Sequence, residues 1–264
     1  MQSIKEILYK VSCGELSPAK AEKMLRLLAV EELDCLAKLD GNRELRKGVP
    51  EIILAEGKTP LDVAQICRVM LANSDRVIVS RCSPEHLAAI KAMPVSDVDF
   101  VVSINEKAKM ALLKKQISSA GNGGGRIGIL TAGTSDIPIA EEAKIIAEEM
   151  GNTVFSSYDV GVAGIHRLIE PLKQLIENDV DVVVVVAGRE GALVSVVAGL
   201  VDVPVIAVPT SNSYGFGAQG VSTLMAMLQS CSLGLAVVNI DGGVAAGAVA
   251  ALIANRAARF RRQV

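Results

Sequence analysis

Aromatic residues are scarce in this sequence, which has four Phe, three Tyr and no Trp among its 264 residues. The core must therefore be built mainly from Val, Ile, Leu and Ala, as in many parallel α/β proteins. Long apolar runs are also lacking, since no stretch reaches the ~20 apolar residues of a membrane helix. The apolar stretch Val180–Ala187 has the length of a buried strand. No membrane partner is expected.

The sequence has no large excess of either charge, with a formal net charge of −2. General affinity for nucleic acids or acidic lipids is therefore not predicted. No C-x-x-C pair is present, which argues against a zinc site and against a disulfide framework. The five cysteines are Cys13, Cys35, Cys67, Cys82 and Cys231. Since Met1–Glu6 also lacks the apolar core of a signal peptide, we predict a cytoplasmic protein with reduced thiols.

A glycine-rich segment, Ser118–Gly125, is the clearest linker and predicts a boundary between residues 1–120 and 121–264. The first part should be a smaller α/β domain that opens with helices. The predicted helices are Met1–Leu39 with a new start at Ser17-Pro18, Thr59–Ala72, Ser83–Met93 and Glu106–Ile117; the predicted strands are Ile52–Leu54, Arg76–Ser80 and Asp99–Ile104. His86 should be an exposed helical residue.

The second part alternates regularly between strand and helix patterns. Predicted strands are Arg126–Thr131, Thr153–Tyr158, Asp181–Ala187, Val205–Val208 and Leu235–Ile240; predicted helices are Ile137–Met150, Ile165–Asn178, Gly191–Leu200, Gln219–Ser230 and Val244–Phe260. Strands this apolar must be covered on both faces. We therefore predict a three-layer α/β domain with a parallel, Rossmann-like or flavodoxin-like sheet, whose ligand binds beyond the carboxyl ends of the strands.

The first strand-end loop, Ala132–Asp136, resembles a phosphate cradle. Gly133 permits close approach of the backbone to a ligand, and Thr134 and Ser135 add hydroxyl groups. Asp136 is placed to cap the following helix, whose free N–H groups would attract an anion. An ordinary capped turn between strand and helix would have the same pattern. The loop matches neither of the two common nucleotide fingerprints, so it does not name the nucleotide.

Three further segments should gather at the same edge of the sheet. His166 and Arg167 follow a glycine-rich loop and could shuttle a proton and clamp an anion, or form a surface pair. Glu190 follows an apolar strand beside Arg189 and could be a general base if buried, or a carboxylate that favours a helix start. The segment Pro209–Gly217, with Ser211, Asn212 and Ser213, could close over a polar ligand or be an exposed connector.

Cys231 precedes the last predicted strand, within Gln229–Gly234. A cysteine there is commonly a small apolar plug, and a nucleophilic role would need the thiolate. A loop that enters a strand lies at the opposite edge of its own sheet from the strand-end loops. Cys231 could therefore join those loops only if another subunit brought it there.

The charged segment Asp40–Glu51 and the following Glu56–Thr59 are typical of solvated surface, but they could also line a site for a charged ligand. Thr131–Asp136, His166-Arg167 and Ala187–Val208 resemble the phosphate loop, His-Arg pair and following strands of the phosphoribosylaminoimidazole carboxylases. That resemblance covers about half the chain, and the N-terminal half has no counterpart in those purine enzymes.

Over nearly its full length the chain resembles the LarB family of nickel-pincer nucleotide cofactor biosynthesis. The matching N-terminal residues are Asp40, Arg43, Arg46, Gly48, Pro50, Glu51 and Glu56–Thr59. The matching C-terminal segments are Thr210–Gly217 and Met227–Ser232. The resemblance implies a carboxylase that converts nicotinic acid adenine dinucleotide to pyridinium-3,5-biscarboxylic acid mononucleotide and releases AMP.

The resemblance also implies roles for particular residues. Cys231 would be the nucleophile, and Glu190 or Asp40 would transfer the proton or place carbon dioxide. The expected ligands of carboxylate and phosphate groups are Arg43, Arg46, Lys58, Gly133, Thr134, Ser135, Asp136, His166, Arg167, Ser211, Asn212 and Ser213. Mg²⁺ could neutralise the pyrophosphate, no organic cofactor is expected, and the resemblance suggests a homo-octamer. An aminoimidazole ribonucleotide carboxylase or mutase and a non-catalytic nucleotide sensor are the alternatives. Carbon dioxide and bicarbonate both stay open as the co-substrate.

Overall fold

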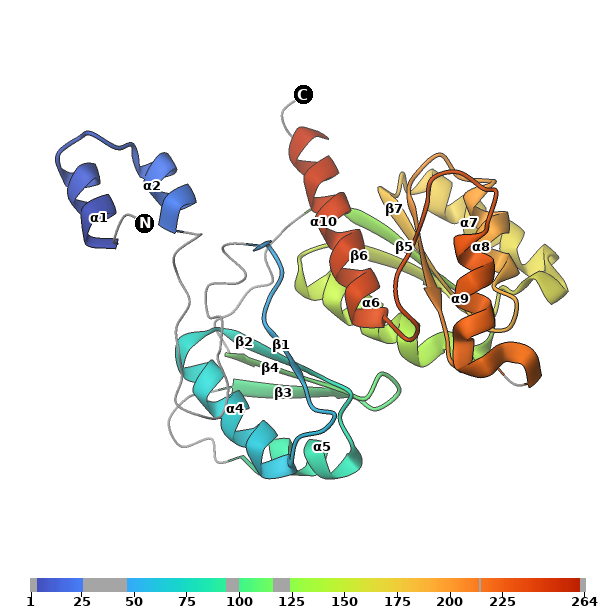
Figure 1. The fold of residues 1–264 in the computed structure, drawn as a ribbon, viewed down its shortest axis with the longest axis horizontal. Helices are drawn as coiled ribbons and strands as arrows, with labels where there is room; N and C mark the ends of the chain where they lie inside the picture. Colours follow the sequence, from blue (N-terminus) through green and yellow to red (C-terminus); the bar gives the residue numbers. More distant parts are fainter. Residues whose placement is uncertain (1–3, 26–46, 94–99, 116–123, 214, 262–264) are drawn as a thin grey trace. The chain divides into compact units, whose positions relative to one another are not determined.

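The computed structural model describes residues 4–25, 47–93, 100–115, 124–213 and 215–261. The chain forms two compact units (Figure 1): residues 1–104 with 111–118, and residues 105–110 with 119–264. The predicted linker lies largely at residues 116–123, outside the described residues, so the predicted boundary stays a prediction. None of the described helices is long and apolar enough to cross a membrane.

The first unit is a small α/β unit. Its helices are α1 (Ile4–Ser12), α2 (Pro18–Leu25), α4 (Pro60–Asn73) and α5 (Pro84–Lys91), and its strands are β1 (Ile52–Leu54), β2 (Arg76–Ser80), β3 (Phe100–Asn105) and β4 (Met110–Lys115). The sheet order is β1-β2-β4-β3, with β1 parallel and β4 antiparallel to β2. Helix α4 begins as expected, because Thr59 and Asp62 form a capping box.

The predicted helix Glu106–Ile117 is wrong. A turn at residues 106–109 joins β3 to β4, and Lys109 has a positive φ of 52° in that turn. Met110, Ala111 and Leu113 are buried in β4, which pairs with the central strand β2. Helix formers dominate this stretch, but pairing with a strand far away in sequence outweighs local propensity.

His86 lies in the predicted helix, but the predicted exposure of its side chain is wrong. Its side chain is buried, with 7% of its surface exposed. Its Nδ1 accepts a hydrogen bond from the Ser83 N–H at 3.0 Å, and its Nε2 lies 2.9 Å from the Lys58 carbonyl oxygen. The imidazole therefore joins the start of α5 to the loop that precedes α4, a role that residue spacing alone does not reveal.

The second unit contains the predicted parallel sheet. Its strands are β5 (Arg126–Thr131), β6 (Thr153–Ser157), β7 (Val182–Ala187), β8 (Val205–Pro209) and β9 (Leu235–Val237). All neighbours are parallel, and the order is β6-β5-β7-β8-β9. Numbered within the unit this order is 2-1-3-4-5, that of flavodoxin-like folds, so the predicted architecture is confirmed.

Helices cover both faces of this sheet. Helices α6 (Ile137–Glu149) and α10 (Gly243–Arg261) pack together on one face, and α7 (His166–Glu177), α8 (Ala192–Ala198) and α9 (Val221–Leu228) lie on the other (Figure 1). The aliphatic core includes all of β7, whose side chains are at most 1% exposed. Gly247 lets α10 approach α6 closely, because a Cβ there would lie 2.4 Å from the Ala143 carbonyl oxygen. This packing leaves the strand-end loops as the place for a ligand.

Candidate active site

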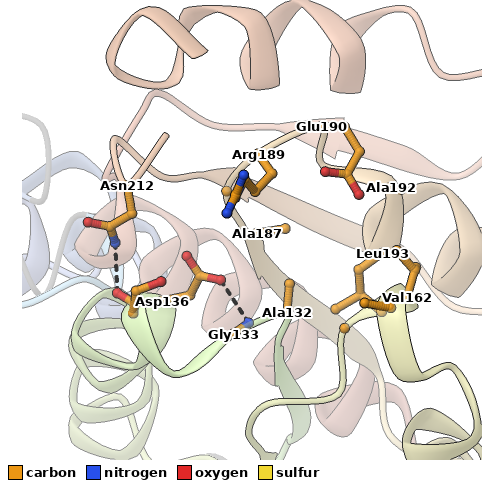
Figure 2. A pocket seen from close by; sticks show the side chains of 14 residues that line it. Ala132, Gly133, Asp136, Val162, Ala187, Arg189, Glu190, Ala192, Leu193 and Asn212 are labelled. Carbon is orange, nitrogen blue, oxygen red and sulfur yellow. Dashed lines mark hydrogen bonds between the residues drawn. The ribbon is translucent and has the colours of Figure 1, made fainter. Parts of the chain in front are cut away.

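A cavity of about 400 Å³ lies where the loops after β5 and β7 diverge. The helices after these two neighbouring strands run to opposite faces of the sheet, which opens a crevice between the loops. The cavity is lined by Ala132, Gly133, Ser135, Asp136, Gly161, Val162, Ala163, Ala187, Gly188, Arg189, Glu190, Ala192, Leu193 and Asn212 (Figure 2). Its small apolar residues and few polar groups are typical of small-molecule sites.

The β5 loop is organised by the Asp136 carboxylate, which is 3% exposed. Asp136 precedes α6, but its side chain makes no capping bond to that helix. The carboxylate instead accepts from the Gly133 N–H at 3.0 Å and from the Thr210 hydroxyl at 2.8 Å. Asp136 therefore ties its own loop to the loop after β8; it occupies the expected N-cap position of α6, but its side chain does not cap that helix.

Burial is the main cause that raises the pKa of Asp136, while hydrogen bonds from Thr210, Gly133, Gly188 and Asn212 lower it. A second link joins the same two loops, since the Asn212 Nδ2 donates to the Ser135 carbonyl oxygen at 2.7 Å. The cavity wall formed by these loops is therefore braced by at least two hydrogen bonds between distant segments. Thr134 is exposed in this loop and does not line the cavity.

The β7 loop places Arg189 and Glu190 at the cavity, across from Gly133 and Ala132 in the view of Figure 2. Arg189 has a φ of +53° and Gly191 a φ of +67°, so Glu190 lies between two left-handed residues. Glu190 is exposed at the mouth of the cavity, and the burial that the sequence analysis required for a general base is not present in the single chain.

The β6 loop contributes Gly161, Val162 and Ala163 to the lining of the cavity. A Cβ at Gly161 would lie 2.5 Å from the Ala132 carbonyl oxygen, so only glycine allows the two loops to approach. His166 and Arg167 begin α7 just beyond this loop and are exposed. Neither residue lines the cavity. The Arg167 Nη1 donates to the Asp159 Oδ2 at 2.5 Å, a surface ion pair.

The β8 loop uses its hydroxyl and amide groups for internal contacts. The Ser211 N–H donates to the Asp241 carboxylate at 2.9 Å, and the Ser213 Oγ accepts from the Arg189 N–H at 3.0 Å. Ser211 is exposed and Ser213 is partly buried. Asn212 is the member of this predicted trio that lines the cavity.

Cys231 is exposed in the loop between α9 and β9. Because β9 is parallel to the other strands, this loop lies at the opposite edge of the sheet from the cavity. The loop is anchored to α8, since the Ser232 hydroxyl donates to the Ser195 carbonyl at 2.8 Å and the Ser195 and Ser230 hydroxyls are 2.8 Å apart. The single chain therefore does not bring Cys231 to the cavity.

The N-terminal ligand predictions are only partly described. Asp40, Arg43 and Arg46 lie at residues 26–46, outside the described residues. The Lys58 Nζ donates to the Leu54 carbonyl at 2.8 Å, and the neighbouring Glu56 forms an ion pair with Arg81 at 3.0 Å. Within the described parts of the chain, no three His, Cys, Asp or Glu side chains gather to hold a metal ion. The described residues therefore do not form a binding site for Mg²⁺.

Thiol reactivity should divide the described cysteines into two classes. Cys13 and Cys231 are exposed, whereas burial raises the pKa of Cys67 to about 12 and that of Cys82 to about 11. Because the thiolate is the reacting form, an aromatic disulfide reagent at pH 8 should modify Cys13 and Cys231 rapidly and the buried pair only on unfolding. The Cys231→Ala variant should have one fewer rapidly modified thiol per chain. Rapid modification of Cys67 or Cys82 in the folded protein would contradict the structure. A Cys35→Ala background keeps the count unambiguous.

Several residues in or behind the cavity wall were not singled out individually from the sequence. Thr210 does not line the cavity, but it is 0% exposed and its hydroxyl donates to the Asp136 carboxylate. Val162 and Ala163 line the cavity through their place on the β6 loop. Arg189 was noted beside Glu190 but was not assigned a ligand. These residues lie in segments that the sequence analysis selected as a whole, and only the tertiary contacts identify them individually.

Comparison with known protein families yields two matches. Residues 30–115 match the model described as LarB/PurE-like N-terminal domain, and residues 126–263 match the model of AIR carboxylase. The second match contains every residue that lines the cavity. The two matches also fall on either side of the glycine-rich segment.

Individual relatives agree with these matches. An uncharacterized protein of Methanocaldococcus jannaschii is 42% identical over 253 residues, which cover 96% of this chain and 97% of that protein. N5-carboxyaminoimidazole ribonucleotide mutase of Thermotoga maritima is 30% identical over 133 residues, 48% of this chain and 74% of the mutase. The mutase of Pyrococcus horikoshii is 30% identical over 120 residues, 44% of this chain and 64% of that enzyme.

Proposed function

Because the chain belongs to the AIR carboxylase family and carries a LarB/PurE-like N-terminal domain, we propose that it carboxylates the pyridinium ring of nicotinic acid adenine dinucleotide. In the same proposal it hydrolyses the phosphoanhydride, with AMP and pyridinium-3,5-biscarboxylic acid mononucleotide as products. The family supports the coarser statement, a carboxylase-type enzyme of nucleotide-related metabolism. The substrate and the covalent route are our proposal.

The observation that carries the proposal is that one chain contains both this cavity and a LarB/PurE-like N-terminal domain. The cavity has small apolar walls and three ionisable residues, Asp136, Arg189 and Glu190. Such a site suits a flat ring, with an anion held by a guanidinium group and loop amides. The mutases match less than half of this chain, so the N-terminal domain is an addition that a purine mononucleotide reaction does not require.

The proposed chemistry has to overcome the electron-poor character of a pyridinium ring, which does not attack carbon dioxide. Addition of a thiolate beside the target carbon moves an electron pair toward the ring nitrogen and converts the ring to an enamine. The enamine carbon then forms the new bond to carbon dioxide. A base removes the proton from that carbon, and the thiolate leaves as the aromatic ring is restored. Covalent catalysis thus divides one difficult step into easier ones.

In this proposal Cys231 supplies the thiolate and Glu190 is the candidate base, with Asp40 as the alternative. The β5 loop with Ser135, together with His166 and Arg167, would receive the mononucleotide phosphate. Lys58, Arg43 and Arg46 would meet the remaining carboxylate or phosphate groups. Hydrolysis places one water oxygen on a phosphate and releases AMP.

A second copy of the chain is a requirement of this proposal. Cys231 is exposed at the opposite edge of the sheet from the cavity of its own chain, so a site containing both must draw on two copies. Seating a neighbour there would also bury Glu190, as the role of a general base demands. We propose a homo-oligomer, and the resemblance to the purine carboxylases suggests an octamer.

The proposal is tested by incubating the protein with nicotinic acid adenine dinucleotide, labelled bicarbonate and Mg²⁺. We expect AMP and a labelled mononucleotide in equal amounts. AMP without labelled product would contradict the carboxylation step. The 30% identity to mutases over the cavity domain makes an aminoimidazole ribonucleotide the second substrate to try, and label in that product alone would favour the mutase-type function. Binding without any turnover would favour a nucleotide sensor.

A further inference from the structure

Two hydroxyl side chains hold the backbone of Arg189 at both of its polar groups. The Arg189 N–H donates to the Ser213 Oγ at 3.0 Å, and the Thr223 hydroxyl donates to the Arg189 carbonyl oxygen. The two hydroxyl oxygens lie 3.3 Å apart. Thr223 comes from α9 and is 0% exposed. Residues from three separate segments thus meet at the backbone of one residue, Arg189.

The direction of each hydrogen bond follows from the number of hydrogens available. The single hydroxyl hydrogen of Thr223 is used on the Arg189 carbonyl, so Thr223 must accept from Ser213. The Ser213 oxygen accepts from the Arg189 N–H and its own hydrogen is given to Thr223. The result is a closed ring of three hydrogen bonds, in which each member is satisfied by the next.

This ring surrounds a backbone conformation that arginine does not favour. The φ of Arg189 is +53°, and left-handed residues other than glycine persist only where neighbouring contacts hold them. Gly191 is also left-handed at +67°, and its N–H donates to the Gly188 carbonyl at 2.9 Å. The turn therefore fixes the direction in which the Arg189 and Glu190 side chains leave the β7 loop, toward the cavity that both line.

We propose that Thr223 and Ser213 are positioning residues that hold Arg189 and Glu190 in the geometry required for turnover. Ser213 then acts through the Arg189 backbone and not as a phosphate ligand. The inference rests on the proposed function, because Glu190 is the base in that reaction. It assigns a role to Thr223, a buried helix residue that is not among those lining the cavity.

The first test compares Thr223→Val with Thr223→Ser. Valine keeps the shape but removes the hydroxyl, so the carbonyl of Arg189 and the hydroxyl of Ser213 lose their partner. We expect kcat to fall about 10²-fold, the scale of a misplaced reacting group, with KM changed only a few fold. Serine keeps the hydroxyl and should restore kcat to near the wild-type value. Equal turnover of the two variants would overturn the proposal.

A crystal structure of Thr223→Val gives a readout that does not depend on the substrate. The residue at 189 should leave the left-handed region and Glu190 should turn from the cavity. A variant that keeps both in place would reject the positioning role, whatever the activity. If the wild-type protein turns over no dinucleotide, the proposed function fails, but this structural comparison still decides the inference.

Ser213→Ala offers an independent route, because it breaks the same ring at a partly buried position and needs no change in the core. The expected loss of kcat is similar, again with the turn displaced. Ser74→Ala is the matched control: the Ser74 hydroxyl bonds the Met70 and Arg76 carbonyls at 2.8 and 2.9 Å, far in sequence from the cavity domain. It should leave kcat within about twofold of the wild type, a surface-scale effect.

Discussion

Cys231→Ala should abolish formation of the biscarboxylated mononucleotide while the protein still binds nicotinic acid adenine dinucleotide. Removing a nucleophile typically lowers turnover by roughly 10⁴–10⁶-fold. Cys231 is exposed and packs into no core, so folding and binding should be unaffected. Product analysis by mass spectrometry and binding by calorimetry measure the two properties separately. Cys13→Ala, which removes the other exposed thiol among the described cysteines, is the control and should keep full activity.

Mixing of two inactive variants tests whether Cys231 acts on the cavity of another copy. Cys231→Ala and Glu190→Gln chains should each be inactive alone. Oligomers reassembled from equal amounts should regain about a quarter of the wild-type activity, because random pairing gives that share of sites both intact residues. No recovery in verified mixed oligomers would argue against a site built from two copies. A Cys231→Ala protein that still makes the biscarboxylate would remove the thiol from the mechanism altogether.

Asp136→Asn should have the second largest effect, on both stability and substrate affinity. The carboxylate accepts from Gly133 and Thr210 at 3.0 and 2.8 Å inside the cavity wall. An amide would turn one N–H group toward these donors, and each buried donor without an acceptor costs about 1–3 kcal/mol. We expect the free energy of unfolding to fall by about 2–4 kcal/mol and KM to rise at least ~10-fold, as the β5 and β8 loops separate.

Denaturant unfolding at several pH values measures how the protonation of Asp136 contributes to the free energy of unfolding. Burial raises its pKa above the ordinary value of 3.8, so the folded state binds the proton more tightly than the unfolded state. Its contribution to stability is therefore full below pH 3.8 and is lost as the pH rises through the folded pKa. In the Asp136→Asn variant, this decrease in the free energy of unfolding with rising pH should be absent. Asp75→Asn removes a carboxylate whose side chain is 77% exposed in its ion pair with Lys115; it is the control and should change stability by less than about 1 kcal/mol.

The sequence was sufficient to predict the second unit almost completely. Its strands are separated by regular helix patterns, and Val182–Val186 is apolar on both faces, which requires a parallel sheet covered on both sides. Parallel order places all strand-end loops at one edge, so the position of the cavity followed as well. Cys231 was also placed correctly, because a loop that enters a parallel strand must lie at the other edge.

Only the tertiary structure decided which side chains meet. The segment Met110–Lys115 is a strand because it pairs with β2, from Arg76↔Lys114 to Val79↔Ala111, and no local pattern encodes a pairing between such distant residues. His86 is buried because the Lys58 carbonyl lies beside it.

At the cavity, the sequence identified hydroxyl and carboxylate groups by type but not their partners. Asp136 joins two loops, Ser213 bonds the Arg189 backbone, and Thr223 completes a ring from another helix. Hydrogen bonds depend on distance and direction within a fraction of an ångström, whereas residue order specifies only which groups are available. The sequence therefore determined the fold and the chemistry at hand, and the packed structure determined which groups hold the site in place.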